Sequence, residues 1–223
     1  MLYLAPLRRC DVADAASWLG ISEPDSFVDE IVRCGVVPLA TNPITLRFLI
    51  EAYRQTGAFP SRRRDLFLQG LRELCRDPRD QIRRSPEESQ LRAEQTLSIA
   101  GRIAAVCILS NRIAVGQESN ETSVAVSDLA GGTERVGNCE TPVAAESVTA
   151  VLKSALFVRG GRWAHRTYCE FLAAWYISRH NVPTQTALSL LLHPLDPTGH
   201  VAPQLHETER GSRLFQTQFL ITS

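Results

Sequence analysis

Lysine is almost missing from this 223-residue chain: of its 24 basic residues only Lys153 is a lysine. It follows Thr149-Ala-Val-Leu, with no glycine-rich turn before it. A phosphate-binding loop needs such a turn followed by Lys and Ser or Thr, because backbone N–H groups surround the phosphates while the ammonium binds the outer ones. The chain therefore has no P-loop, and ATP hydrolysis by the usual route is excluded.

Metal and membrane signals are missing as well. The six cysteines lie far apart, with no C-x-x-C pair and no histidine at ligand spacing, so no zinc or redox motif is indicated. No stretch approaches the roughly 20 apolar residues of a membrane span. The apolar start at residues 1–6 is followed at once by charges, unlike a signal peptide. We expect no metal, no membrane contact and a cytoplasmic location.

The charges balance, with 24 basic and 24 acidic residues, so the net charge gives no steering towards nucleic acid. Residues 62–64 and 83–84 are all arginine and could form a basic patch, but acidic residues surround them. A solvated helix face is the favoured interpretation, and a nucleic-acid partner is not expected. No Ser/His/Asp or Cys/His constellation is present, so we predict no catalytic residue and no enzyme.

Helix start and stop signals predict a mostly α-helical chain that begins with a four-helix subdomain over residues 1–78. Asn42 and Pro43 form the clearest start, a cap followed by a first-turn proline, and Gly57 the clearest stop. The four expected helices run from Asp11 to Leu19, from Ser22 to Gly35, from Pro43 to Tyr53 and from Pro60 to Leu74.

A winged-helix domain is expected over residues 85–180. Ser85-Pro-Glu-Glu88 starts a helix that runs to about Leu109, and a second helix is expected over 143–154. A β-hairpin around Gly160-Gly161, the only clear strands we expect, leads into a strong helix over 167–178. Residues 116–142 are rich in Ser, Thr, Gly, Asn and Glu and are predicted to be a flexible surface insertion. Residues 181–223 are expected to begin a repeat region with a poorly ordered tail.

Two stretches in combination resemble the NACHT-type branch of the STAND nucleotide-switch NTPases. Val37-Pro-Leu-Ala-Thr-Asn-Pro-Ile-Thr-Leu-Arg-Phe-Leu49 resembles the P-L-x-L-x-x-L helix of the small helical domain that follows their P-loop core. Leu156-Phe-Val-Arg-Gly-Gly-Arg-Trp-Ala-His-Arg-Thr-Tyr-Cys-Glu-Phe-Leu-Ala-Ala174 is similar to the F-x-H-x-T-x-x-E-F-x-A-A signature of their winged-helix domain. The order of the two stretches, their separation and the hairpin before the histidine together carry the resemblance.

The resemblance implies a fragment that lacks the P-loop core and the C-terminal sensor repeats, which would be its partners in a full-length relative. In that family Pro43 would pack on the adenine and ribose of ATP or ADP, and His165 would reach the β-phosphate. We therefore expect both residues to face one shared cleft. The fragment alone would bind no nucleotide tightly, and the surface left by the missing core would be apolar and prone to self-association.

Each candidate residue also has a purely structural interpretation. Pro43 can simply preorganise a helix start, and His165 can end a hairpin strand bonded to a nearby carbonyl. The rest of the signature, Glu170, Phe171, Ala173 and Ala174, is interpreted as helix packing, with Glu170 four residues from Arg166 and able to pair with it at the surface.

The function implied by the resemblance is an ATP/ADP-controlled oligomerisation switch in signalling or antiphage defence, of which this chain is a non-hydrolytic part. Two other classes stay open. A free-standing winged-helix DNA-binding regulator is disfavoured because the 143–154 helix offers only Lys153 as a cation. A helical protein-interaction adaptor is compatible with the neutral charge.

Overall fold

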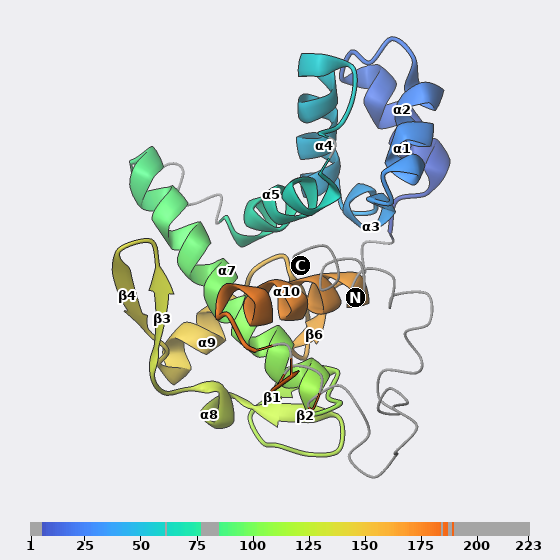
Figure 1. Cartoon of the computed structure of the whole chain (residues 1–223). Helices are drawn as coiled ribbons and strands as arrows, with labels where there is room; N and C mark the ends of the chain where they lie inside the picture. The colour runs from blue at the N-terminus through green and yellow to red at the C-terminus, as the bar shows by residue number, and fades with distance from the viewer. Residues whose placement is uncertain (1–5, 61, 77–84, 184, 187–188, 190–223) are drawn as a thin grey trace. The chain divides into compact units, whose positions relative to one another are not determined.

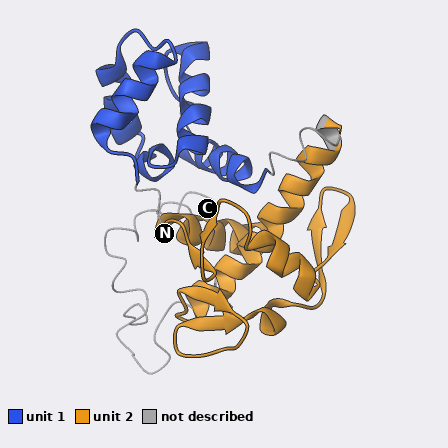
Figure 2. Cartoon of the chain, turned by 180° about the vertical axis from the view of Figure 1, so that it is seen from behind, with its two compact units in different colours: residues 1–76 blue, residues 77–223 orange. Residues whose placement is uncertain are grey.

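The computed structural model describes residues 6–60, 62–76, 85–183, 185–186 and 189. The chain divides into two compact units, residues 1–76 and residues 77–223 (Figure 2). Each unit encloses an apolar core of its own. The expectation of a mostly helical protein is confirmed, since helices dominate the described part of both units (Figure 1).

Unit 1 contains the four expected helices and one more. The additional helix, α3, is a single turn that the hydrophobic pattern is too short to reveal, so the expected four-helix subdomain is incomplete. The helices described in this unit are α1 (Arg9–Trp18), α2 (Pro24–Arg33), α3 (Val37–Ala40), α4 (Pro43–Thr56) and α5 (Arg63–Cys75).

Local caps decide where these helices begin. The Asn42 side chain accepts the Ile44 backbone N–H at 2.9 Å, and Gly57 ends α4 with φ +70, as expected. The start expected for α1 is wrong. Asp11 lies inside the helix and accepts the Arg8 backbone N–H at 2.8 Å, so the helix begins before it.

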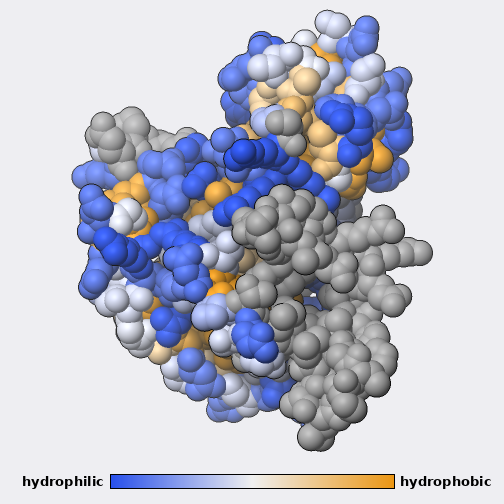
Figure 3. Space-filling view, viewed as in Figure 1, coloured by the Kyte–Doolittle hydropathy of each residue, from blue (hydrophilic) through white to orange (hydrophobic). Residues whose placement is uncertain are grey.

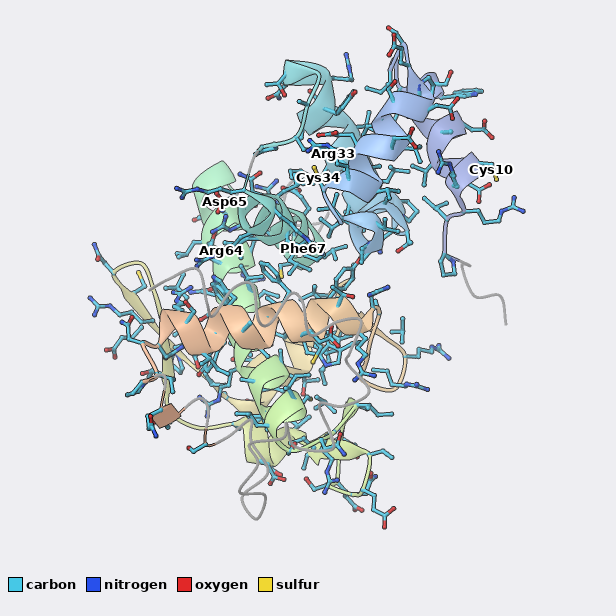
Figure 4. All side chains as sticks on the ribbon, turned by 45° about the vertical axis from the view of Figure 1, so that its right-hand side comes forward. Cys10, Arg33, Cys34, Arg64, Asp65 and Phe67 are labelled. Atoms are coloured by element: carbon cyan, nitrogen blue, oxygen red, sulfur yellow. The ribbon has the colours of Figure 1, made fainter. Side chains whose placement is uncertain are left out.

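The core of unit 1 gathers around α2, α4 and α5, where Phe27, Leu49 and Phe67 are fully buried. The α5 residue Arg63 donates to the Gly35 carbonyl at 2.7 Å, just beyond the α2 end that Arg33 and Cys34 mark in Figure 4. Arg63, one residue of the basic run 62–64, therefore links α5 to the loop that follows α2. The other run, 83–84, lies outside the described residues.

Unit 2 is built on α7 (Pro86–Leu109) and α10 (Arg166–Arg179), which cross in contact (Figure 1). Helix α7 starts at Ser85 as expected, and Ser85 and Glu88 form a capping box there, with both hydrogen bonds at 3.2 Å. Gly101 permits the close crossing, because a Cβ added there would lie 3.0 Å from the Trp175 ring. The other helices described here are the one-turn α8 (Val126–Leu129) and α9 (Ala145–Val151), shorter than the 143–154 expected.

Six strands in the described residues correct the expectation of a single hairpin. They are β1 (Ala114–Gly116), β2 (Ser123–Ala125), β3 (Thr133–Val136), β4 (Cys139–Pro142), β5 (Phe157–Val158) and β6 (Arg162–Trp163). The expected β5–β6 hairpin is present, but β1 adds to it antiparallel and β2 adds to β1 parallel, giving the order β2-β1-β6-β5. Strands β3 and β4 form a second, separate hairpin.

The interpretation of residues 116–142 as a flexible surface insertion is wrong. The segment carries β2, α8, β3 and β4, and its Val124, Leu129, Glu134 and Val136 are buried. Its polar composition conceals short segments that bury only one face. Residues 181–223 lie almost wholly outside the described residues, so the repeat region stays a prediction. Within the described ranges no helix is both long and apolar enough to cross a membrane.

Candidate functional site

His165 stands at the junction between β6 and α10, where it is the N-cap of the helix. Its backbone is extended, with φ −147 and ψ 136, and its Nδ1 accepts the Thr167 backbone N–H at 3.1 Å. The structural interpretation in which the ring bonds to a carbonyl is therefore wrong: the ring satisfies a backbone donor. Because Nδ1 is used as an acceptor, the neutral ring carries its proton on Nε2.

The half-buried position of His165 also sets its charge. Loss of solvent lowers the pKa of the imidazole, so the ring is neutral at pH 7. In the described part of the chain Nε2 has no hydrogen-bond partner. The site thus offers one N–H donor, next to the N-terminus of α10, where the helix dipole favours a negative group.

A pocket of about 660 Å³ opens beside His165, wholly within unit 2. It lies between the end of α7, strand β6 and the first turn of α10. After the end of α7, Asn111 has a left-handed backbone with φ 54, and the Arg112 N–H donates to the Cys107 carbonyl at 2.8 Å. This turn leads the chain into the pocket wall. The described residues that line it are Cys107, Ile108, Asn111, Ile113, Arg162, Trp163, Ala164, His165, Arg166 and Cys169.

The electrostatics of the pocket are one-sided. Two arginines, Arg162 and Arg166, line it, and no Asp or Glu is among its described lining residues. Arg166 pairs with Glu170 at 3.0 Å, the pairing expected from their spacing. Glu170 is only 6% exposed, however, so this is not the surface pair that was expected, and burial raises the pKa of its carboxyl.

The two thiols in the pocket wall, Cys107 and Cys169, are unreactive at neutral pH. Burial raises the pKa of Cys107 to about 11 and also raises that of Cys169. The Trp163 indole N–H partly offsets the effect of burial on the Cys107 pKa. Both sulfurs are protonated at neutral pH, so they serve as apolar wall and not as nucleophiles.

Pro43 is the first residue of α4 in unit 1 and is exposed. It fills the helix position where a missing N–H costs nothing. Because Pro43 and His165 belong to separate units, their sharing of one cleft stays a prediction.

The rest of the signature is packing. Glu170, Phe171, Ala173 and Ala174 are all buried on α10, as expected for residues that pack the helix.

A second polar cluster surrounds Glu134 of β3, which is only 1% exposed. Its Oε1 accepts the Tyr176 hydroxyl at 2.7 Å, and its Oε2 lies 3.4 Å from His180 Nε2 and 3.4 Å from Ser98 Oγ. Arg102 lies 3.7 Å from Oε1. This network ties the β3–β4 hairpin to α7 and α10.

Sequence reasoning missed the Glu134 network, although a weak signal exists. Glu134 lies two residues before Val136 on β3, so the two side chains share the buried face of the strand. Its partners come in pairs four residues apart, Ser98 with Arg102 and Tyr176 with His180, each pair on one face of a helix. Only the fold brings the three elements together.

No group of three or more metal-ligating side chains occurs among the described residues. Comparison with protein-family models, with curated proteins and with solved structures gives no match.

Proposed function

We propose that this chain supplies the helical and winged-helix parts of a nucleotide-controlled oligomerisation switch of the NACHT-type STAND class. In this proposal Pro43 packs on the adenine and ribose of bound nucleotide, and His165 donates to the β-phosphate in the resting state. The chain itself hydrolyses nothing, since it has no P-loop lysine. The switch would act in signalling or defence.

The observation that carries the proposal is the state of His165. Its Nδ1 is held by the Thr167 N–H, which fixes the ring, and its Nε2–H is left as a donor at a helix N-terminus. A fixed neutral donor beside a positive helix end and two arginines suits a phosphate oxygen.

The order of elements in unit 2 supports the winged-helix assignment. Helix α7 is followed by β1, β2, α8, the β3–β4 hairpin, α9, the β5–β6 hairpin and then α10. Strand β1 pairs with β6 at Ala114 and Arg162, so the hairpin is joined to the first strand that follows α7. The DNA-binding alternative is weakened further, because α9 has the sequence AESVTAV and contains no basic residue.

Unit 1 exposes several large apolar side chains, which supports the proposal that this unit binds a partner. Trp18 is 92% exposed, and orange apolar surface interrupts the polar surface of this unit in Figure 3. Other large apolar residues of the unit that are at least two-fifths exposed are Leu19, Val32, Val37 and Ile44. This favours docking of an NTPase core or self-association over an isolated monomeric role.

The test is a titration of the isotope-labelled full chain with ADP, followed by NMR and calorimetry. We expect no ATP hydrolysis and a Kd no tighter than about 1 mM, near 4 kcal/mol. ADP should shift the His165 ring and the Thr167 amide, whereas AMP, which lacks the β-phosphate, should not. The variant His165→Asn, which can still cap α10, should lose the response. Micromolar binding, hydrolysis, or an ADP response unchanged by His165→Asn would contradict the proposal.

A further inference from the structure

The pocket of unit 2 contains more unused hydrogen-bond donors than a phosphate contact at His165 requires. In the described part of the chain the Arg162 guanidinium and the Asn111 amide make no hydrogen bond or ion pair. Together with Nε2 of His165 they place three side chains with free donors around one hollow. A few convergent polar groups in a concave site are typical of small-molecule binding sites.

The remaining wall is apolar. Ile108, Ile113 and Trp163 line the pocket with the protonated thiols of Cys107 and Cys169. The Trp163 ring is held in place by the Phe157 ring, whose centroid is 4.3 Å away. The volume of about 660 Å³ is within the usual range for a drug-sized ligand.

The positive charge of the pocket favours an anionic ligand. Both charged residues that line the pocket in the described structure, Arg162 and Arg166, are cationic. Arg166 already pairs with Glu170 at 3.0 Å, so Arg162 and the N-terminus of α10 supply the positive charge that is left for a ligand. A ligand with a negative charge at one end and an apolar body would satisfy the donors and cover the apolar wall. A bare phosphate would leave that wall in water, and a neutral apolar molecule would leave Arg162, Asn111 and the Nε2–H of His165 without a partner in the pocket.

We propose that this pocket binds a small organic anion with a flat apolar body, such as an aromatic carboxylate. The anionic group lies between Arg162, Asn111 and His165, and the body lies against Trp163, Ile108 and Ile113. This site is contained in unit 2 and does not depend on the nucleotide switch. Since His165 takes part in both, an occupied pocket would also compete with a phosphate for the same Nε2–H.

The probe is 2-naphthoate, and its matched control is 2-naphthamide, which has the same shape without the charge. Calorimetry on the full chain should give a Kd of about 1 mM or tighter for the carboxylate. The amide should bind about tenfold more weakly, because the charge-assisted hydrogen bonds are lost. NMR shifts should cluster at residues 107–113 and 162–166.

Two pairs of variants test the position. Arg162→Gln should weaken 2-naphthoate about tenfold, whereas Arg159→Gln, an exposed arginine of the same hairpin outside the lining, should not. Ile113→Glu places a carboxylate at the pocket and should weaken binding, whereas Val158→Glu, at an exposed residue of β5, should not. Ile113 and Val158 are 55% and 48% exposed, so both variants should fold.

The outcomes are separable. Equal binding of acid and amide, no binding of either at millimolar concentration, or equal effects of Arg162→Gln and Arg159→Gln would overturn this site. If the probe fails while ADP still shifts Thr167 through His165, the pocket proposal alone is wrong. If the probe binds as expected while ADP has no effect, only the nucleotide switch is overturned.

Discussion

Acid affects His165 in two ways, because this residue is both a titratable group and the N-cap of α10. Burial lowers its pKa from the ordinary 6.5. Below that pH the unfolded chain binds a proton at this position more readily than the folded chain, so acidification favours unfolding. A protonated ring also has no acceptor left for the Thr167 N–H.

The variant His165→Asn should therefore change the pH dependence of stability. Asparagine keeps an acceptor for the cap and does not titrate. We expect the free energy of unfolding of the unmodified protein to fall faster than that of the variant as the pH drops below 6.5, and the two profiles to run parallel at pH 7–8. Urea denaturation across pH 5–8 measures this. Profiles that stay parallel throughout would show that His165 titrates alike in both states.

Glu134 is the centre of the buried polar network that links β3 to α7 and α10. Replacing it with glutamine exchanges one acceptor oxygen for a donor N–H₂, which then faces the Tyr176 hydroxyl or His180 Nε2. We expect Glu134→Gln to lower the free energy of unfolding by about 2 kcal/mol. Glu140→Gln, at an exposed residue of the same hairpin, should change it by less than about 0.5 kcal/mol. Equal effects would mean that the network adds no stability.

At the scale of elements, the β5–β6 turn offers two adjacent glycines with different surroundings. Gly160 has φ +81 and open space around it, whereas a Cβ on Gly161, at φ +67, would lie 2.0 Å from the Val115 carbonyl oxygen. Gly160→Ala should cost about 1–2 kcal/mol through backbone strain alone. Gly161→Ala should cost more than about 3 kcal/mol, because β1 must also move away from β6. Thermal unfolding of both variants compares them, and similar costs would contradict the close approach of these strands.

The elements that sequence reasoning predicted best are those whose signals are local. The start of α4 at Asn42 and Pro43, its stop at Gly57 and the start of α7 at Ser85 all depend on hydrogen bonds within a few residues. The β5–β6 hairpin likewise depends on the Gly160-Gly161 turn. Such signals can be read without knowing the fold.

The elements that it missed depend on distant partners. Strand β1 is three residues long and pairs with β6 through Ala114 and Arg162, far apart in the chain. No periodicity can reveal so short a strand. The same holds for the site: the spacing around His165 pointed to a histidine before a helix, but only the fold places Asn111 and Arg162 in one pocket with it.

At the scale of the whole molecule, the six cysteines report burial in both units. Cys10 and Cys139 are exposed, Cys34 is half-buried, and Cys75, Cys107 and Cys169 are buried. Since the thiolate is the reactive form, burial slows alkylation both by blocking access and by raising the pKa, to about 11 for Cys107. The sequence alone gives no such order, because all six cysteines lack recognisable motifs.

Iodoacetamide labelling at pH 7.5, followed by peptide mass spectrometry, should therefore separate three classes. Cys10 and Cys139 should react first and Cys34 later, because burial and Glu30 raise the pKa of its thiol. Cys75, Cys107 and Cys169 should react at least about 100-fold more slowly than the exposed pair, since labelling must wait for local opening. In denaturant all six should react alike, which controls for intrinsic reactivity. If Cys107 or Cys169 reacts as fast as Cys139 in the folded protein, the burial of that sulfur is wrong.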